Sequence, residues 1–159
     1  MNRYISTMEL DAIDKHILNT LQVDSKITNA ALAQKINLSP AATFERVKKL
    51  EQQEVITNYA AQVDHSKLGF LVHLIAGIRL QKITAEHIKL FKLTIDKIAS
   101  ITTCYQVIGD FDFILMVQAK DLASYQATVV EKIHMLPFMD HVKTLSVARL
   151  VKNKPLSIE

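Results

Sequence analysis

The spacing of apolar residues changes near residue 65, and this change constrains the fold more than any other feature of the sequence. In MELDAIDKHILNTLQ, apolar side chains recur every three or four residues, which is typical of one face of an α-helix. In LVHLIAGIRL they alternate with other residues, as in a β-strand. The turn-forming cluster HSKLGF lies between the two patterns. We therefore predict a domain over 1–63, with 1–8 as a tail, a hinge over 64–70 and a second domain over 71–159.

The first domain has the pattern of three helices followed by a hairpin. Thr28 precedes the second helical segment and Ser39 precedes the third, and either hydroxyl can cap a helix N-terminus. Pro40 takes the first helical position, where its missing N–H costs nothing. The segment VITNYAAQVD is rich in β-branched and aromatic residues, which predicts a small hairpin over Val55–Asp64. This order is that of a winged helix-turn-helix.

The second domain alternates strand-like and helical segments. Two strands flank a Gly-Asp turn in ITTCYQVIGDFDFILMVQA, and further strands are predicted in LVHLIAGIRL and HVKTLSVARLV. The two helical segments begin at Thr84 and Asp121, which are good N-cap residues. The order β-α-β-β-α-β predicts a ferredoxin-like domain and an α+β fold class. The residues of the second helix that we expect to point inward are Leu122, Tyr125, Val129, Ile133 and Leu136.

The predicted sheet carries apolar side chains on both faces. In one strand, Phe113, Leu115 and Val117 alternate with Ile114 and Met116. Two helices can cover one face of this sheet, and soluble monomers rarely leave a large apolar patch exposed. We therefore expect the chain to associate with copies of itself through the open face.

The third helix of the first domain has an apolar side and an opposite polar side. At 3.6 residues per turn, Phe44, Val47 and Leu50 form the predicted buried side. The opposite side is made of Ala42, Arg46, Lys49 and Gln53. From this periodicity alone, a solvated amphipathic helix is favoured over a DNA-binding helix.

A helix-turn-helix places its second helix in the major groove, with N-terminal residues at the base edges. The small side chains of Ala42 and Thr43 would permit close approach. Arg46 could then read a guanine and Lys49 could contact a phosphate. The candidate DNA-binding residues are Ser39, Ala42, Thr43, Arg46 and Lys49.

The segments ELDAIDKHILNTLQ, TNAALAQKINLS and LSPAATFERVKKLEQQEVI resemble the DNA-binding half of the leucine-responsive regulatory protein/AsnC family of transcription regulators. The segment VIGDFDFILMVQAKDLASYQ resembles the effector-binding domain of the same family. The resemblance extends from Glu9 to Lys152 and implies a sequence-specific DNA-binding regulator that responds to a small molecule. Two residues depart from the family pattern. Glu54 replaces a helix-ending Gly and alters or strains that turn, and Ala42 replaces a frequent Pro or Ser, which could shift base preference.

In this family the effector, often an amino acid, binds between dimers beside the Gly-Asp turn, and the dimers assemble further, up to an octamer. A carboxylate suits an α-ammonium group, and the N–H groups of a tight turn suit an α-carboxylate. For Asp110, a role in the turn geometry alone is an equal alternative. The resemblance implies an effector site at Gly109, Asp110, Phe111, Asp112, Thr144 and Ser146.

Charge and composition indicate which partners and which cellular compartment to expect. Residues 1–65 carry seven Lys/Arg and eight Asp/Glu, so a DNA-binding surface there is a local patch or requires several copies. A single cysteine suits a reducing compartment. The sequence shows neither an apolar leader nor an apolar run long enough to span a membrane. We expect a cytoplasmic, nucleoid-associated protein with double-stranded DNA and no membrane as its partner.

The residues give little support to an enzyme. The six histidines lack H-x-x-x-H and H-E-x-x-H spacing, and neither a G-x-S-x-G motif nor a Gly-rich phosphate loop is present. We therefore expect no catalytic residue, cofactor or metal site. Two alternatives remain open. One is a siroheme-decarboxylase-like enzyme of haem biosynthesis, because such enzymes resemble the same family; the other is an architectural protein that coats DNA without effector control.

The two-faced apolar pattern of the sheet makes a prediction about assembly. Light scattering at micromolar concentration should give the mass of a dimer or of a larger even-numbered assembly, because association covers the open face. A monomeric mass under these conditions would contradict the packing argument.

Overall fold

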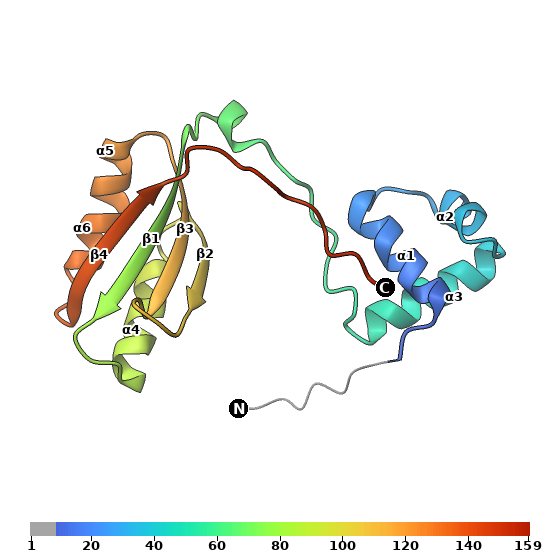
Figure 1. Ribbon diagram of the computed structural model, residues 1–159, viewed down its shortest axis with the longest axis horizontal. Coiled ribbons are helices and arrows are strands. Elements are labelled where there is room, and N and C mark those ends of the chain that lie inside the picture. Colours follow the sequence, from blue (N-terminus) through green and yellow to red (C-terminus); the bar gives the residue numbers. More distant parts are fainter. Residues whose placement is uncertain (1–8) are drawn as a thin grey trace. The chain divides into compact units, whose positions relative to one another are not determined.

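The computed structural model describes residues 9–159, so the predicted tail over 1–8 lies outside the described residues. The chain forms two compact units (Figure 1). One unit is Val63–Val151, and the other combines the residues up to Gln62 with Lys152–Glu159. This division differs from the predicted one at the C-terminus, because the last eight residues pack with the helical unit.

From residue 9 onward, the helical unit contains three helices, each with the cap that the sequence predicts or an equivalent one. The Thr28 hydroxyl accepts the N–H of Ala31 at 3.2 Å, and the Ser39 hydroxyl accepts that of Ala42 at 3.2 Å. The helices are α1 (Ala12–Val23), α2 (Asn29–Lys35) and α3 (Pro40–Gln52). Their apolar sides meet in a core of Ile17, Leu18, Leu32, Ile36 and Leu50.

The predicted hairpin over Val55–Asp64 is wrong, since the structure has no strand in these residues. The chain instead turns back at the end of α3, where the N–H groups of Val55 and Ile56 donate to the carbonyl of Leu50 at 2.9 and 3.2 Å. Both side chains are partly buried against the helical core. These two β-branched side chains therefore pack against the core and do not belong to a strand.

The second unit confirms the predicted β-α-β-β-α-β order. Its four antiparallel strands lie in the order β2-β3-β1-β4, as in a ferredoxin-like sheet, and its second helix contains a π-helical segment. The strands are β1 (Val72–Leu80), β2 (Ile101–Gln106), β3 (Phe113–Ala119) and β4 (Met139–Ser146). The helices are α4 (Ala85–Ile95) and the continuous series α5 (Leu122–Tyr125), π segment (Gln126–Val130) and α6 (Glu131–His134). A 3₁₀ turn, His65–Leu68, precedes β1.

The helices of this unit pack on one face of the sheet. On β1, Leu74, Ala76 and Ile78 are fully buried in a core shared with the helices. Between them, Ile75 points to the other face, which we call the open face. The exposed apolar residues of the open face include Tyr105 and Leu145. The predicted two-faced apolar sheet is thus present, while self-association stays a prediction.

The second helix departs from the regular 3.6 residues per turn over Gln126–Val130. Tyr125, Val129 and Ile133 are all buried although they lie four residues apart. In a regular α-helix this spacing drifts around the axis, and the wider π turn over Gln126–Val130 corrects the drift. Leu122 was predicted to point inward but is 60% exposed, because it begins the helix at the edge of the core.

Glu54 adopts the left-handed conformation expected of the Gly that it replaces, with φ of 56°. Its N–H donates to Glu51 and that of Val55 donates to Leu50, both at 2.9 Å, so the residue ends α3. Only Gly adopts this conformation without steric cost.

Glu54→Gly should therefore raise the free energy of unfolding by about 1 kcal/mol, because it relieves the left-handed strain. Urea unfolding followed by circular dichroism measures this change. The control is Glu51→Gly inside α3, which should lower stability by a similar amount. A less stable Glu54→Gly protein would show that the turn is not strained.

Candidate functional site

The buried side of α3 is rotated relative to the predicted one. Thr43 is fully buried, whereas Phe44, which was predicted to be buried, is 54% exposed. Thr43 is suited to burial because its hydroxyl donates to the Ser39 carbonyl at 3.0 Å. The burial of its side chain does not favour the predicted contact between Thr43 and DNA, which stays a prediction. The spacing Thr43, Val47, Leu50 would have indicated this side if a threonine had been accepted in the core.

Arg46 lies in an ion-pair cluster between α3 and the start of α1. Its Nη1 atom is 2.7 Å from a carboxylate oxygen of Asp11 and 2.7 Å from one of Asp14. The pKa of Asp11 lies below its ordinary value, first because its carboxylate accepts the Asp14 N–H and then because of Arg46. Asp14 itself is buried. The guanidinium thus links α3 to the start of α1, and its predicted contact with a base stays a prediction.

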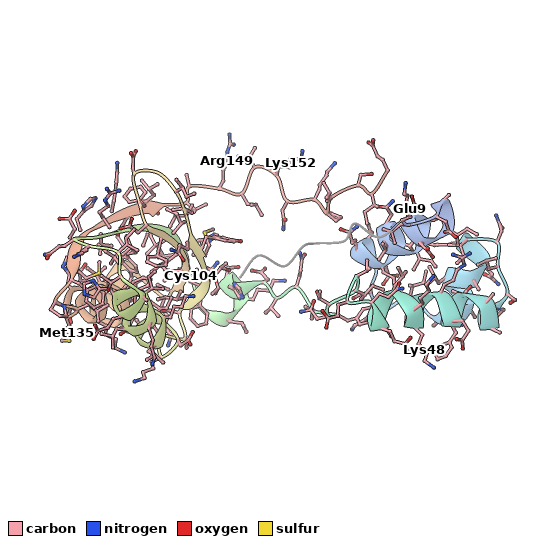
Figure 2. The ribbon with its side chains drawn as sticks, turned by 90° about the horizontal axis from the view of Figure 1, so that it is seen from below. Glu9, Lys48, Cys104, Met135, Arg149 and Lys152 are labelled. Carbon is pink, nitrogen blue, oxygen red and sulfur yellow. The ribbon has the colours of Figure 1, made fainter. Side chains whose placement is uncertain are left out.

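Of the five predicted DNA-binding residues, Ala42 and Lys49 are exposed, and the Ser39 hydroxyl is used as the cap of α3. Sequence reasoning missed Phe44 and Lys48, whose ammonium lies 6.0 Å from the Phe44 ring centre. Figure 2 shows Lys48 projecting away from α3. The exposed surface of α3 that could meet a groove consists of Ala41, Ala42, Phe44, Glu45, Lys48 and Lys49.

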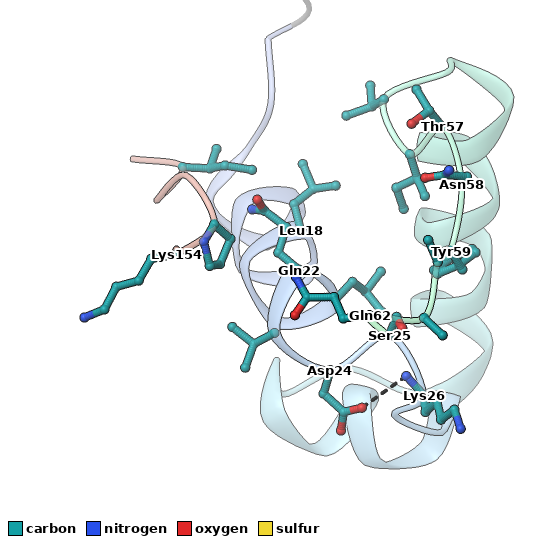
Figure 3. Close-up of a pocket in the computed structure, with 18 of the residues that line it drawn as sticks. Leu18, Gln22, Asp24, Ser25, Lys26, Thr57, Asn58, Tyr59, Gln62 and Lys154 are labelled. Carbon is teal, nitrogen blue, oxygen red and sulfur yellow. Dashed lines mark hydrogen bonds between the residues drawn. The ribbon is translucent and has the colours of Figure 1, made fainter. Parts of the chain in front are cut away.

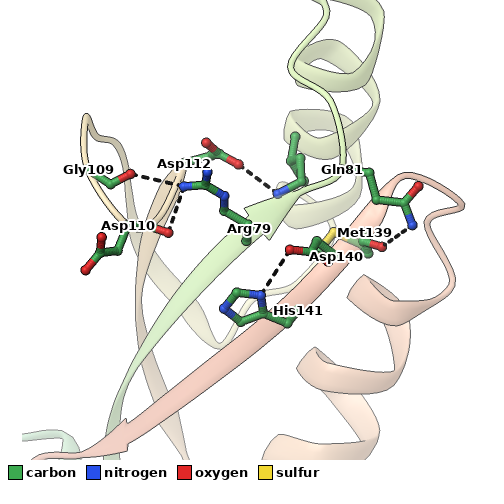
Figure 4. A network of polar contacts seen from close by, with 9 residues as sticks. Arg79, Gln81, Gly109, Asp110, Asp112, Met139, Asp140 and His141 are labelled. Carbon is green, nitrogen blue, oxygen red and sulfur yellow. Dashed lines mark hydrogen bonds and ion pairs between the residues drawn. The ribbon is translucent and has the colours of Figure 1, made fainter.

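A second polar cluster surrounds the turn between β2 and β3. Arg79 donates from Nη1 to the carbonyls of Gly109 at 3.1 Å and Asp110 at 2.9 Å, so it ties the turn to β1 (Figure 4). Gly109 has φ of 145°, which disfavours a side chain there. The Asp110 side chain is exposed. Arg79 was missed by sequence reasoning, although its alternation on β1 indicates the open face.

Phe111 and His141 extend this cluster over the open face. The Phe111 ring covers Gly77, where an added Cβ would lie 2.8 Å from ring atoms. His141 on β4 pairs with Arg79 on β1, and its ring is 6.1 Å from that of Phe111. We call Arg79, Asp110, Phe111 and His141 the turn cluster.

Asp112 has a structural contact within the chain, and its predicted role in effector binding stays a prediction. It is 7% exposed, and its Oδ2 accepts the N–H of Leu80 at 2.7 Å. Its own N–H donates to the Ile78 carbonyl at 2.8 Å. The carboxylate thus completes the hydrogen bonding at the end of β1.

Within one chain, the predicted residues of β4 do not join the turn cluster. Thr144 pairs with Ala76 on the helix-covered face, and its hydroxyl lies 2.6 Å from that of Tyr125. Ser146 pairs with Leu74, toward the opposite end of β4 from His141. The predicted six-residue effector site is therefore divided over two faces.

The described residues provide no cluster of three or more His, Cys, Asp or Glu side chains that could hold a metal ion. In the same part of the chain, no helix has the length and apolar character needed to cross a membrane.

Comparison with known proteins matches both units. The family described as winged helix-turn-helix DNA-binding matches residues 10–57, and the Lrp/AsnC ligand binding domain matches residues 73–156. The Bkd operon transcriptional regulator of Pseudomonas aeruginosa is 34% identical over 136 residues, which cover 86% of this chain and 89% of that protein. The leucine-responsive regulatory protein of Escherichia coli is 33% identical over 144 residues, covering 91% and 88%. A transcriptional regulator from Neisseria meningitidis, solved in complex with L-methionine, has a TM-score of 0.88 at 21% identity, covering 95% of this chain and 97% of that one.

A helix-turn-helix unit joined to a ligand-binding domain defines a transcriptional regulator that binds DNA and a small ligand. The chain belongs to the Lrp/AsnC family of such regulators. The resemblance seen in the sequence and the α+β fold class are thereby confirmed. Because these relatives are named as transcriptional regulators, the chain is a regulator and not an enzyme.

The Arg46 cluster predicts a stability effect. Arg46→Ala should lower the free energy of unfolding by about 1–3 kcal/mol, because it leaves the buried Asp14 carboxylate without its partner. Lys48→Ala, on the exposed side of the same helix, should change it by less than about 0.5 kcal/mol. Adding Asp14→Ala to Arg46→Ala should restore part of the loss, as measured by urea unfolding. Equal stability of all four proteins would contradict the positioning role of Arg46.

Proposed function

We propose that this regulator responds to an amino acid that binds at the turn cluster. The observation that carries the proposal is that the main-chain carbonyl of Asp110 holds the guanidinium of Arg79 at the turn, while the Asp110 side chain is exposed. An amino acid carries one charge of each sign on its α-carbon, so a neighbouring carboxylate and guanidinium can bind both ends. The L-methionine complex of the Neisseria meningitidis regulator, which has the same fold, supports this ligand class.

Arg79 retains donors for such a ligand. A guanidinium has five N–H donors, and the two turn carbonyls are both bound through Nη1. These bonds fix the position of the guanidinium, so little ordering would be needed on binding. The aromatic ring of Phe111 adds an apolar surface beside the charges. In this proposal Gly109, Asp110, Phe111 and Arg79 form the site, while Asp112, Thr144 and Ser146 have structural roles.

For DNA binding we propose that the exposed surface of α3 enters the major groove. Lys48 and Lys49 would contact phosphates, and Ala42 would allow close approach.

The near balance of charge in residues 1–65 makes one copy a weak binder of DNA. We therefore propose a homodimer that assembles further, up to an octamer, and gains affinity through several linked helices. Acting on DNA in this way, the protein would be nucleoid-associated in the cytoplasm.

The effector proposal is tested by a thermal-shift screen against the twenty amino acids, since a ligand of the folded state raises the melting temperature. Asp110→Ala should weaken the affinity for the best amino acid by about tenfold or more, because a charge-assisted hydrogen bond contributes about 1.5–3 kcal/mol. Asp96→Ala, an exposed aspartate at the end of α4, is the matched control and should bind normally.

The same proteins should then be titrated with DNA selected by the wild-type protein, with and without the amino acid. The wild type and Asp96→Ala should change their DNA affinity on adding the amino acid, and Asp110→Ala should not. Normal binding by Asp110→Ala would show that the aspartate serves only the turn. A wild type that binds DNA but ignores all twenty amino acids would favour the architectural alternative.

A further inference from the structure

The C-terminal end of the chain docks on α1 through a specific set of hydrogen bonds. The Asn19 side chain donates to the Ile158 carbonyl at 2.9 Å and accepts the Ile158 N–H at 3.0 Å. One helical turn later, the Gln22 side chain donates to the Leu156 carbonyl at 3.1 Å. These contacts join residues separated by 139 and 134 positions in the chain.

Ile158 anchors this end of the chain. From residue 148 to residue 159 it is the one side chain that is not exposed. It packs against the core formed by Ile17, Leu18 and their neighbours in the helical unit. The amide of Asn19 binds both backbone groups of the same residue, as a neighbouring strand would. The contact thus combines backbone recognition by a side chain with burial of one apolar group.

The docked segment is not enclosed by the helical unit. Together with α1 and residues 55–62 it borders an open cavity of about 960 Å³, to which Lys154, Pro155 and Ile158 contribute (Figure 3). Lys154 and Leu156 are exposed, and few contacts hold the segment besides those of Ile158. A segment held this way can dissociate without unfolding the helices.

We propose that α1 carries a docking site for an extended carboxy-terminal peptide and that its occupant is the segment Leu156–Ile158 of this chain. Asn19 and Gln22 recognise the extended backbone, and the apolar core selects the isoleucine side chain. The chain passes from one unit to the other twice, between Gln62 and Val63 and again between Val151 and Lys152. The chain before β1 enters the ligand-binding unit directly from the helical unit. The segment after β4 returns to the helical unit, where its end is held by the contacts with Asn19 and Gln22 and can be released.

The first test uses the full-length chain and measures hydrogen exchange of the Ile158 amide, which is a donor in the docked state. This amide should be protected in the wild type and lose its protection in Asn19→Ala and in Ile158→Asp. The matched control is Val151→Asp, which places the same charge on an 84% exposed residue outside the docked segment. An unprotected Ile158 amide in the wild type, or unchanged protection in both variants, would overturn the proposal.

The second test supplies the segment in trans. A chain ending at Val151 is mixed with a synthetic peptide of residues 152–159, KNKPLSIE. The peptide should raise the melting temperature of the shortened chain but not that of the full-length chain, whose site is occupied. The same peptide carrying Ile158→Asp should have no effect. Absence of any shift in a folded shortened chain would overturn the proposal, and if that chain does not fold, the exchange experiment decides alone.

Discussion

Two helical segments cover one face of a four-stranded sheet, and the arrangement of the ligand-binding unit follows from this one-sided cover. Because side chains alternate along each strand, every core residue of β1 on the helix-covered side has a neighbour on the open face. Leu80 completes the core while the adjacent Arg79 reaches the turn between β2 and β3. The same strands thus build the core on one side and display the turn cluster on the other.

The order of elements and most helix starts could be predicted from the sequence, because they depend on local chemistry. The hydroxyls of Thr28, Ser39 and Thr84 cap helices through residues three positions away, and such signals are visible in a short segment. The hairpin over Val55–Asp64 could not be predicted correctly, because β-branched residues suit partial burial as well as strands.

The candidate sites were harder to predict because their geometry depends on distant partners. Arg46 finds its carboxylates 32 and 35 residues earlier in the chain, and no pattern within α3 reveals them. Asp112 in turn belongs to the end of β1, 32 residues before it. In both cases the structure uses the charge of the residue to hold two elements together, a contact that the local sequence does not reveal. The turn itself was located correctly, since Gly109 and Asp110 are a local signal.

The π turn between α5 and α6 marks a position where the chain can lose one residue. Tyr125 and Ile133 both reach the core although eight residues separate them, which in a regular helix would place them about 80° apart. If the step between them were seven positions instead of eight, the angle would fall to about 20°, so a regular helix would suffice. Gln126–Val130 is therefore a place where one residue can be lost while both ends of the helix keep their side chains in the core. The same loss in the middle of α4 would rotate everything after it by about 100° and turn Ile95 away from the sheet.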